Sequence, residues 1–138
     1  MLLARLTEAN GAPGQEGEVR DLIRAEIEAY AHEVKTDALG NLIAIKNPDA
    51  PGPKVMLAAH MDEVALMIVG ADNNGYLKFR PIGGVDPRVL VAKTVVIGDE
   101  KVPGVIGSKP IHLQKPAERN RAFAIQELVI DIGARNKE

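Results

Sequence analysis

Hydrophobic residues recur at helical spacing in two segments at the start of the chain. A short pattern predicts a helix over residues 1–9 that ends at the loop Asn10–Gly14. A longer pattern predicts an amphipathic helix over Glu16–Ala31. Its apolar positions are Val19, Leu22, Ile23, Ile27 and Tyr30. The opposite side carries charged residues, which we expect to face water, and the loop Asn10–Gly14 is either a connector or part of a pocket wall.

The next pattern predicts a β-hairpin. Glu33–Thr36 and Leu42–Lys46 are two short strand-like segments. Gly40 and Asn41 lie between them and tolerate the positive φ of a tight turn. His32 precedes the first strand without an evident partner, so a surface or capping position is expected.

A continuous apolar run, Val55–Ala59, ends abruptly at His60. Such a run predicts a strand buried on both faces of a sheet. Ligand sites of α/β sheets lie beyond the carboxyl ends of such strands. Residues two apart in an extended chain point the same way, so His60 and Asp62 would face one pocket. A carboxylate that orients an imidazole is typical of metal sites, but two polar side chains at a solvent-exposed strand end would give the same pattern.

From Glu63 onward the pattern changes to short β segments separated by glycine-rich turns. The expected strands are Val64–Gly70, Tyr76–Arg80, Val89–Val91, Thr94–Ile97, Val102–Ile106 and Glu127–Ile132. This spacing is typical of a small antiparallel barrel or sandwich. The sequence therefore predicts an α/β part over residues 1–63 and a mostly β part over residues 64–138.

Composition narrows the function classes. The 138 residues are 46% hydrophobic but only 3% aromatic, and the formal net charge is −2. This argues against nucleic acid and membrane surfaces as partners, because both demand a basic face. The chain has no cysteine, which excludes thiolate chemistry and is compatible with a reducing cytoplasm. Neither a secretory signal nor an apolar stretch near the roughly 20 residues of a membrane span is present.

Few kinds of catalytic chemistry remain. There is no phosphate loop, dinucleotide fingerprint or nucleophile elbow. Asp62 and Glu63 are adjacent, so on a strand they point to opposite faces and cannot form a glycosidase acid pair. A catalytic zinc needs about three protein ligands, and His60 is the one good candidate. His112, in the loop Gly107–His112, is a weaker one, for which a surface or inter-subunit contact is the alternative.

Four motifs occur together along the chain. They are Thr36–Leu42 (TDALGNL), Met56–Glu63 (MLAAHMDE), Pro81–Leu90 (PIGGVDPRVL) and Val102–Pro110 (VPGVIGSKP). With them the chain closely resembles the N-terminal part of the tetrahedral-aminopeptidase (glutamyl-aminopeptidase-like) family of cytosolic metallopeptidases. Members of this family have also been labelled endoglucanases.

The resemblance implies an α/β peptidase domain, here residues 1–63, followed by an incomplete PDZ-like β-barrel insertion, residues 64–138. It implies that His60 is a ligand of one of two metal ions, usually zinc or cobalt, and that Asp62 is a catalytic-site residue that orients the imidazole. The metal pair would activate a water that cleaves the first peptide bond of a short peptide. The insertion would support dimers that assemble into dodecamers.

The chain also departs from this family. Members are more than twice as long, and their bridging carboxylate, general base and remaining metal ligands come later in the sequence. We therefore expect a fragment that is inactive alone. The alternatives are a non-enzymatic module that assembles or binds peptides along a sheet edge, or another hydrolase on this scaffold such as a deacylase.

Overall fold

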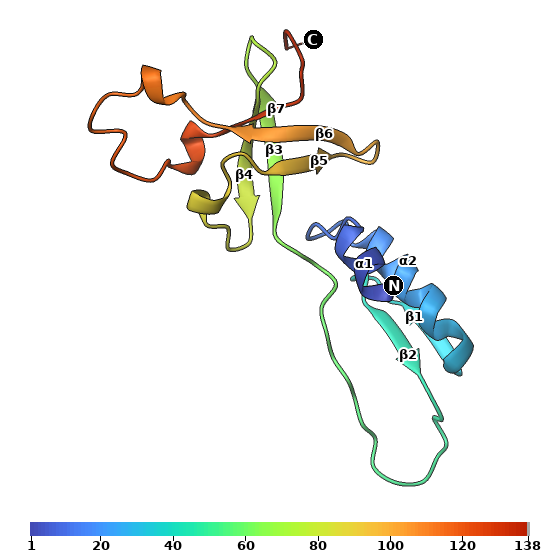
Figure 1. The fold of residues 1–138 in the computed structure, drawn as a ribbon. Coiled ribbons are helices and arrows are strands. Elements are labelled where there is room, and N and C mark those ends of the chain that lie inside the picture. Colours follow the sequence, from blue (N-terminus) through green and yellow to red (C-terminus); the bar gives the residue numbers. More distant parts are fainter. Residues whose placement is uncertain (138) are drawn as a thin grey trace. The chain divides into compact units, whose positions relative to one another are not determined.

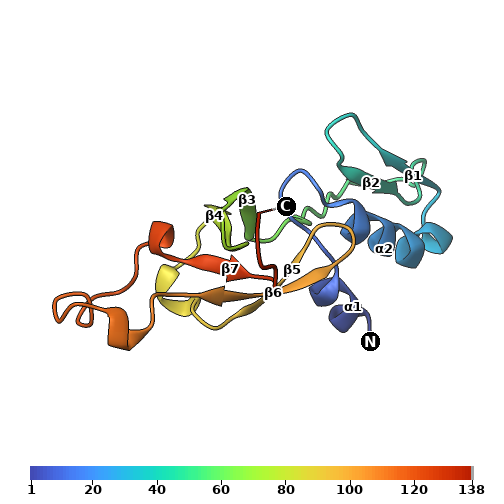
Figure 2. The same cartoon turned by 90° about the horizontal axis from the view of Figure 1, so that it is seen from above.

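The computed structural model describes residues 1–137, and the chain divides into two compact units, Met1–Glu63 and Val64–Glu138. Figures 1 and 2 show the two units from perpendicular directions. The first unit contains helices and a hairpin, and the second is built on an antiparallel sheet. The mixed α/β character expected from the sequence is thereby confirmed. No helix in residues 1–137 is both long enough and apolar enough to cross a membrane.

Two helices open the first unit. Helix α1 spans Leu2–Glu8 and α2 spans Gly17–Ile27. Val19 is buried on α2, while Leu22, Ile23 and Ile27 are half-buried, so most of the predicted apolar stripe is covered. Tyr30 is exposed. It lies in a 3-10 turn, Glu28–Tyr30, whose tighter winding moves Tyr30 off the stripe of the α-helix.

The predicted hairpin is present as β1, Glu33–Thr36, and β2, Leu42–Ile45, which pair antiparallel. Its turn is ordered by Asp37, whose carboxylate accepts the backbone N–H groups of Leu39 and Asn41 at 2.9 Å. Gly40 supplies the positive φ, +87°.

The charged side of α2 also contributes to this hairpin. Arg24 donates to the Thr36 hydroxyl at 2.8 Å, and Arg20 donates to the Gly40 carbonyl at 3.2 Å. The expectation that this side faces only water is therefore wrong for the two arginines, because they reach the hairpin packed beside the helix.

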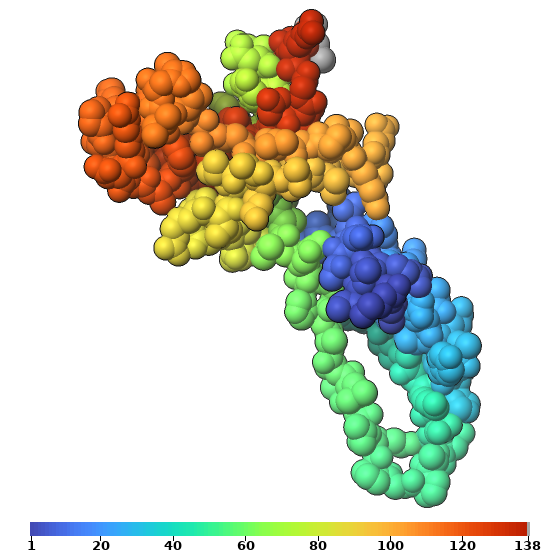
Figure 3. Space-filling view, viewed as in Figure 1, coloured from blue at the N-terminus to red at the C-terminus, as the bar shows by residue number. Residues whose placement is uncertain are grey.

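The buried strand expected over Val55–Ala59 is not formed. Residues 53–64 belong to no helix or strand, and Val55, Met56 and Leu57 are 82%, 87% and 94% exposed. Figure 3 shows this green segment as a single extended stretch of chain with open space beside it. An apolar run predicts burial on both faces only where neighbouring strands cover it, and no strand in residues 1–137 pairs with this segment. The prediction fails for lack of partner strands.

The second unit is a five-stranded antiparallel sheet in the order β3-β4-β7-β6-β5. The strands are β3 Ala65–Ala71, β4 Leu77–Ile82, β5 Thr94–Ile97, β6 Val102–Gly107 and β7 Val129–Asp131. The last strand therefore lies in the middle, between β4 and β6 (Figure 1). β3 and β5 are the two edges of the sheet. Five of the six expected strands are present.

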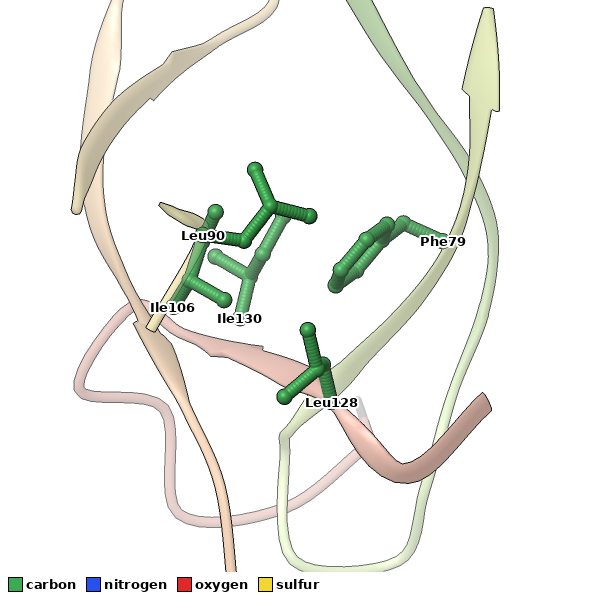
Figure 4. Close-up of a cluster of buried hydrophobic side chains, with 5 residues drawn as sticks. All are labelled: Phe79, Leu90, Ile106, Leu128 and Ile130. Atoms are coloured by element: carbon green, nitrogen blue, oxygen red, sulfur yellow. The ribbon is translucent and has the colours of Figure 1, made fainter. Parts of the chain in front are cut away.

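One compact core holds this sheet together. Phe79, Leu90, Ile106, Leu128 and Ile130 form a buried cluster (Figure 4). Leu90 comes from the segment Val89–Val91, for which the sequence predicted a strand. The structure has a 3-10 turn there, Pro87–Val89, capped by the Asp86 carboxylate, which accepts the N–H of Arg88 at 2.9 Å. The prediction was wrong because the Asp-Pro pair starts a helical turn, which directs Leu90 into the core.

Candidate functional site

The candidate site begins where the extended segment reaches the rest of the first unit. Residues 51–60 are all exposed, whereas Met61 is half-buried. The next residue but one, Glu63, donates its backbone N–H to the carbonyl of Gly11 at 2.8 Å. His60 and Asp62 therefore lie at the end of a segment whose last residues are attached to the loop between α1 and α2.

The side chains of His60 and Asp62 lie together, as their spacing in an extended chain suggests. Nδ1 of His60 is 3.2 Å from Oδ1 of Asp62 and 2.9 Å from its backbone carbonyl oxygen. Both neighbours of Nδ1 are hydrogen-bond acceptors, so a neutral imidazole at this position carries its proton on Nδ1. The lone pair of the neutral ring is then on Nε2, which is the state in which imidazole binds a metal.

The surroundings of this pair are open. The His60 side chain is 84% exposed and that of Asp62 48%. Within residues 1–137, no group of three or more His, Cys, Asp or Glu side chains is placed to hold a metal ion. The donor set therefore fits one ligand of a metal site, an imidazole with an orienting carboxylate, and leaves the other ligands to be supplied from elsewhere.

The second region singled out in the sequence is the loop after β6. His112 lies exposed in a 3-10 turn, Ile111–Leu113, and the structure gives it no metal-ligating companions among the described residues. Lys109 pairs with Glu118 at 3.0 Å. Next to this loop lies an open hollow of about 410 Å³, lined by residues that include Tyr76, Lys109 and Asp131.

Ion pairs, which sequence inspection missed, order this long loop. Arg121 makes a two-pronged contact with the Glu127 carboxylate, at 2.5 and 2.6 Å, and Glu127 also accepts the backbone N–H of Ala124 at 2.7 Å. These bonds lower the pKa of Glu127 to about 2, with the Arg121 hydrogen bonds as the main cause. The sequence shows both charges but not that the loop brings them together.

Comparison with known proteins places the chain in a family. The M42 glutamyl aminopeptidase family matches residues 40–138, which include both His60 and Asp62. The chain belongs to this family. The resemblance expected from the four motifs is thereby confirmed.

Individual relatives agree with this assignment. The M42 chain is 39% identical to a lysyl aminopeptidase of Pyrococcus furiosus over 141 residues, which is 99% of the chain and 40% of the relative. It is similar to the TET aminopeptidase of Thaumarchaeota archaeon SCGC AB-539-E09, with a TM-score of 0.90, 36% identity, and coverage of 99% of the chain and 38% of that structure. A third similar structure is the TET1 peptidase of Pyrococcus horikoshii, with a TM-score of 0.84, 36% identity, and coverage of 99% and 41%.

The endoglucanase name also occurs among the solved structures. The structure from Thermotoga maritima that carries it has a TM-score of 0.79 and 34% identity, and the match covers 99% of the M42 chain and 39% of that structure. The chain spans about two fifths of the length of the curated relatives it matches.

Proposed function

We propose that this chain is the N-terminal part of a two-metal aminopeptidase that removes N-terminal residues from short peptides. The contact between His60 and Asp62 carries the proposal, because it leaves Nε2 of an exposed imidazole available as a ligand within a chain of the M42 family. The names of its relatives support the reaction class, since they include lysyl and glutamyl aminopeptidases.

In this proposal His60 holds one of two divalent ions, zinc or cobalt, through Nε2. Asp62 acts through His60: its Oδ1 and its backbone carbonyl oxygen accept hydrogen bonds from the Nδ1–H group, which fixes the ring orientation and makes Nε2 more basic. When bound, a pair of such ions would supply an acidified water and a polarised peptide carbonyl. Because residues 1–137 offer only this corner of the site, we expect the isolated chain to be inactive.

The second unit has a proposed role in assembly. We propose that it is part of a PDZ-like β-barrel insertion through which copies of the whole protein form dimers and larger homo-oligomers in the cytoplasm. The TET1 peptidase of Pyrococcus horikoshii, to which the chain is similar, can assemble into a tetrahedron or a large octahedral shell. An edge strand such as β3 or β5 carries unpaired backbone groups that can pair with another chain.

Hydrolysis of a chromogenic aminoacyl substrate tests the enzymatic proposal. The whole protein should release the N-terminal residue, lose this activity on chelation, and regain it with zinc or cobalt. The intact mass of the native protein shows whether chain beyond residue 138 is present. Activity that survives complete removal of metal would contradict the proposal.

A second candidate is a non-enzymatic module that assembles or binds peptides by strand addition. It is favoured by the two free sheet edges of a unit that has its own core. If the native protein has the mass of the 138-residue chain, self-associates, and binds neither zinc nor cobalt at micromolar concentrations, this candidate replaces the first.

A further inference from the structure

Gly11 contacts the backbone on both sides of Asp62. Its carbonyl accepts the Glu63 backbone N–H at 2.8 Å, and its α-carbon lies against the backbone of Met61. These two contacts lie on either side of Asp62. They therefore fix the chain immediately before and immediately after the residue that orients the imidazole.

Space, not backbone conformation, requires glycine here. A Cβ on Gly11 would lie 2.9 Å from the carbonyl oxygen of Met61 and 3.2 Å from Cγ2 of Val19. The φ of Gly11 is not in the left-handed region, where glycine would be favoured for its own conformation. The nearer obstacle is backbone, which cannot rotate away as a flexible side chain can, so a methyl group must push the Met61 carbonyl outward.

The other side of Gly11 is packed against buried residues. Gly11 and Ala9 are buried, and Val19 is buried on α2. The preceding residue, Asn10, donates its backbone N–H to the Glu18 carboxylate at 3.2 Å, which attaches the loop to the first turn of α2. A side chain at position 11 therefore displaces residues 61–63, which form no helix or strand among the described residues.

We propose that Gly11 is a positioning residue for the candidate site: its missing side chain and its carbonyl together hold Asp62 where Oδ1 and the backbone carbonyl oxygen of Asp62 accept hydrogen bonds from Nδ1 of His60. The inference deepens the proposed function and rests on it for the meaning of the imidazole as a ligand. A purely structural glycine would affect folding of the unit but not the state of the His60 ring.

The test compares Gly11→Ala with Gly17→Ala in the 15N-labelled chain of residues 1–138. Gly17 is a matched control in the same unit, because a Cβ there meets only the end of the Arg20 side chain, at 3.6 Å. Two signals are measured at a pH where imidazole is neutral: hydrogen exchange at the Glu63 amide, and the ring 15N shifts of His60, which report whether Nδ1 or Nε2 carries the proton. Amide protection along α2 reports whether the unit remains folded.

In Gly11→Ala we expect faster exchange at Glu63 and a shift of His60 from the Nδ1–H form toward a mixture of tautomers, with α2 still protected. Gly17→Ala should leave both signals unchanged. An unchanged His60 tautomer in a folded Gly11→Ala chain would overturn the inference. If Gly11→Ala does not fold, Glu63→Pro removes the N–H donor without adding a side chain at position 11, and an unchanged His60 tautomer in that variant overturns the inference equally.

A separate measurement distinguishes this inference from the proposed function. In the whole protein, equilibrium zinc binding should be about tenfold weaker for Gly11→Ala, as is common when a residue that orients a ligand is disturbed. If the tautomer shifts but neither protein binds zinc, Gly11 positions the pair and the metal proposal fails. If zinc binds equally well to both proteins, the positioning inference fails and the metal proposal stands.

Discussion

The two units of this chain differ in where their apolar residues lie. The second unit buries five large side chains in one cluster, including Ile106 and Ile130 at 1% exposure. The first unit buries only small or medium-sized residues among those described, such as Ala9 and Val19, and leaves Val55, Met56 and Leu57 exposed. The candidate site, His60 and Asp62, is in the first unit, which has the smaller core, and the larger buried cluster is in the second unit. Stability and catalysis should therefore respond to different residues.

Replacing His60 should have the largest effect on function and almost none on folding. We expect His60→Ala to reduce peptidase activity of the whole protein on the order of 10³-fold or more, because a metal ion contributes several kcal/mol to the reaction. In the 138-residue chain the side chain is 84% exposed, so the free energy of unfolding of that chain should change by less than about 0.5 kcal/mol. Asp62→Asn should weaken metal binding by roughly 10–100-fold.

Steady-state hydrolysis and bound-metal analysis of the whole protein, and urea unfolding of the 138-residue chain, check this expectation. The control is His112→Ala, since His112 has no ligand role in the proposal. Full activity in His60→Ala would refute the assignment of the metal ligand, and equal losses in both variants would show that the effect is not specific to the site.

Shortening a side chain in the core of the second unit should instead have its main effect on folding. Ile130→Ala removes a side chain that is 1% exposed at the centre of the sheet. Its expected cost is about 2–5 kcal/mol of unfolding free energy, from lost burial and a residual cavity. The matched control, Val105→Thr, keeps a β-branched side chain at a 46% exposed position on β6 and should change stability by less than about 0.5 kcal/mol.

Urea unfolding, monitored by NMR signals from the second unit, measures the unfolding free energy of the two variants. A loss below about 1 kcal/mol for Ile130→Ala would contradict the view that this cluster holds the sheet together. Signals of the first unit, recorded in the same titration, show whether loss of this core side chain also changes the unfolding of the first unit.

The sequence predicted local structure well where short-range chemistry decides it. Gly40 and Asn41 marked the hairpin turn, and the helical spacing that includes Val19 marked α2. The i, i+2 relation placed His60 beside Asp62, and the structure has their side chains 3.2 Å apart. These features depend on neighbours within a few residues, so a single sequence contains most of the information.

Predictions failed where distant partners decide the structure. The run Val55–Ala59 has the composition of a buried strand, but burial depends on strands that must come from other parts of a chain. Arg20 and Arg24 look like solvent-facing residues until the hairpin is packed beside α2. Gly11 gave no recognisable signal, because its role depends on contacts with residues 61 and 63, some 50 positions later.

Acid should weaken the second unit through Glu127. Its pKa is about 2 in the folded chain, against an ordinary value of 4.5, because Arg121 and the Ala124 N–H stabilise the carboxylate. A group with a lowered folded pKa contributes stability that is present above its unfolded pKa. That stability is lost as the pH falls from about 4.5 toward 2. Because the ion pair is exposed, the effect should be modest and should shrink in salt.

Thermal unfolding between about pH 6 and pH 2 measures this loss. Glu127→Gln should flatten that part of the stability profile. Asp86→Asn is the comparison variant and should flatten it as well, because the pKa of Asp86 is also lowered to about 2, mainly by the hydrogen bonds that it accepts from Arg88. An identical acid response in wild type and Glu127→Gln would show that the Arg121–Glu127 pair contributes nothing to the stability of the loop.

The smallest expected effect is that of Leu57→Ala in the 138-residue chain. Leu57 is 94% exposed in a segment without strand partners, so the free energy of unfolding should change by less than about 0.5 kcal/mol. In the whole protein, we expect the strand that the sequence predicts over Val55–Ala59 to form between further strands, and there the same change should cost about 2–5 kcal/mol. Urea unfolding of both proteins measures the difference. Equal and small effects would mean that no later part of the protein covers this run, and a large loss in the 138-residue chain would mean that the run is already buried within it.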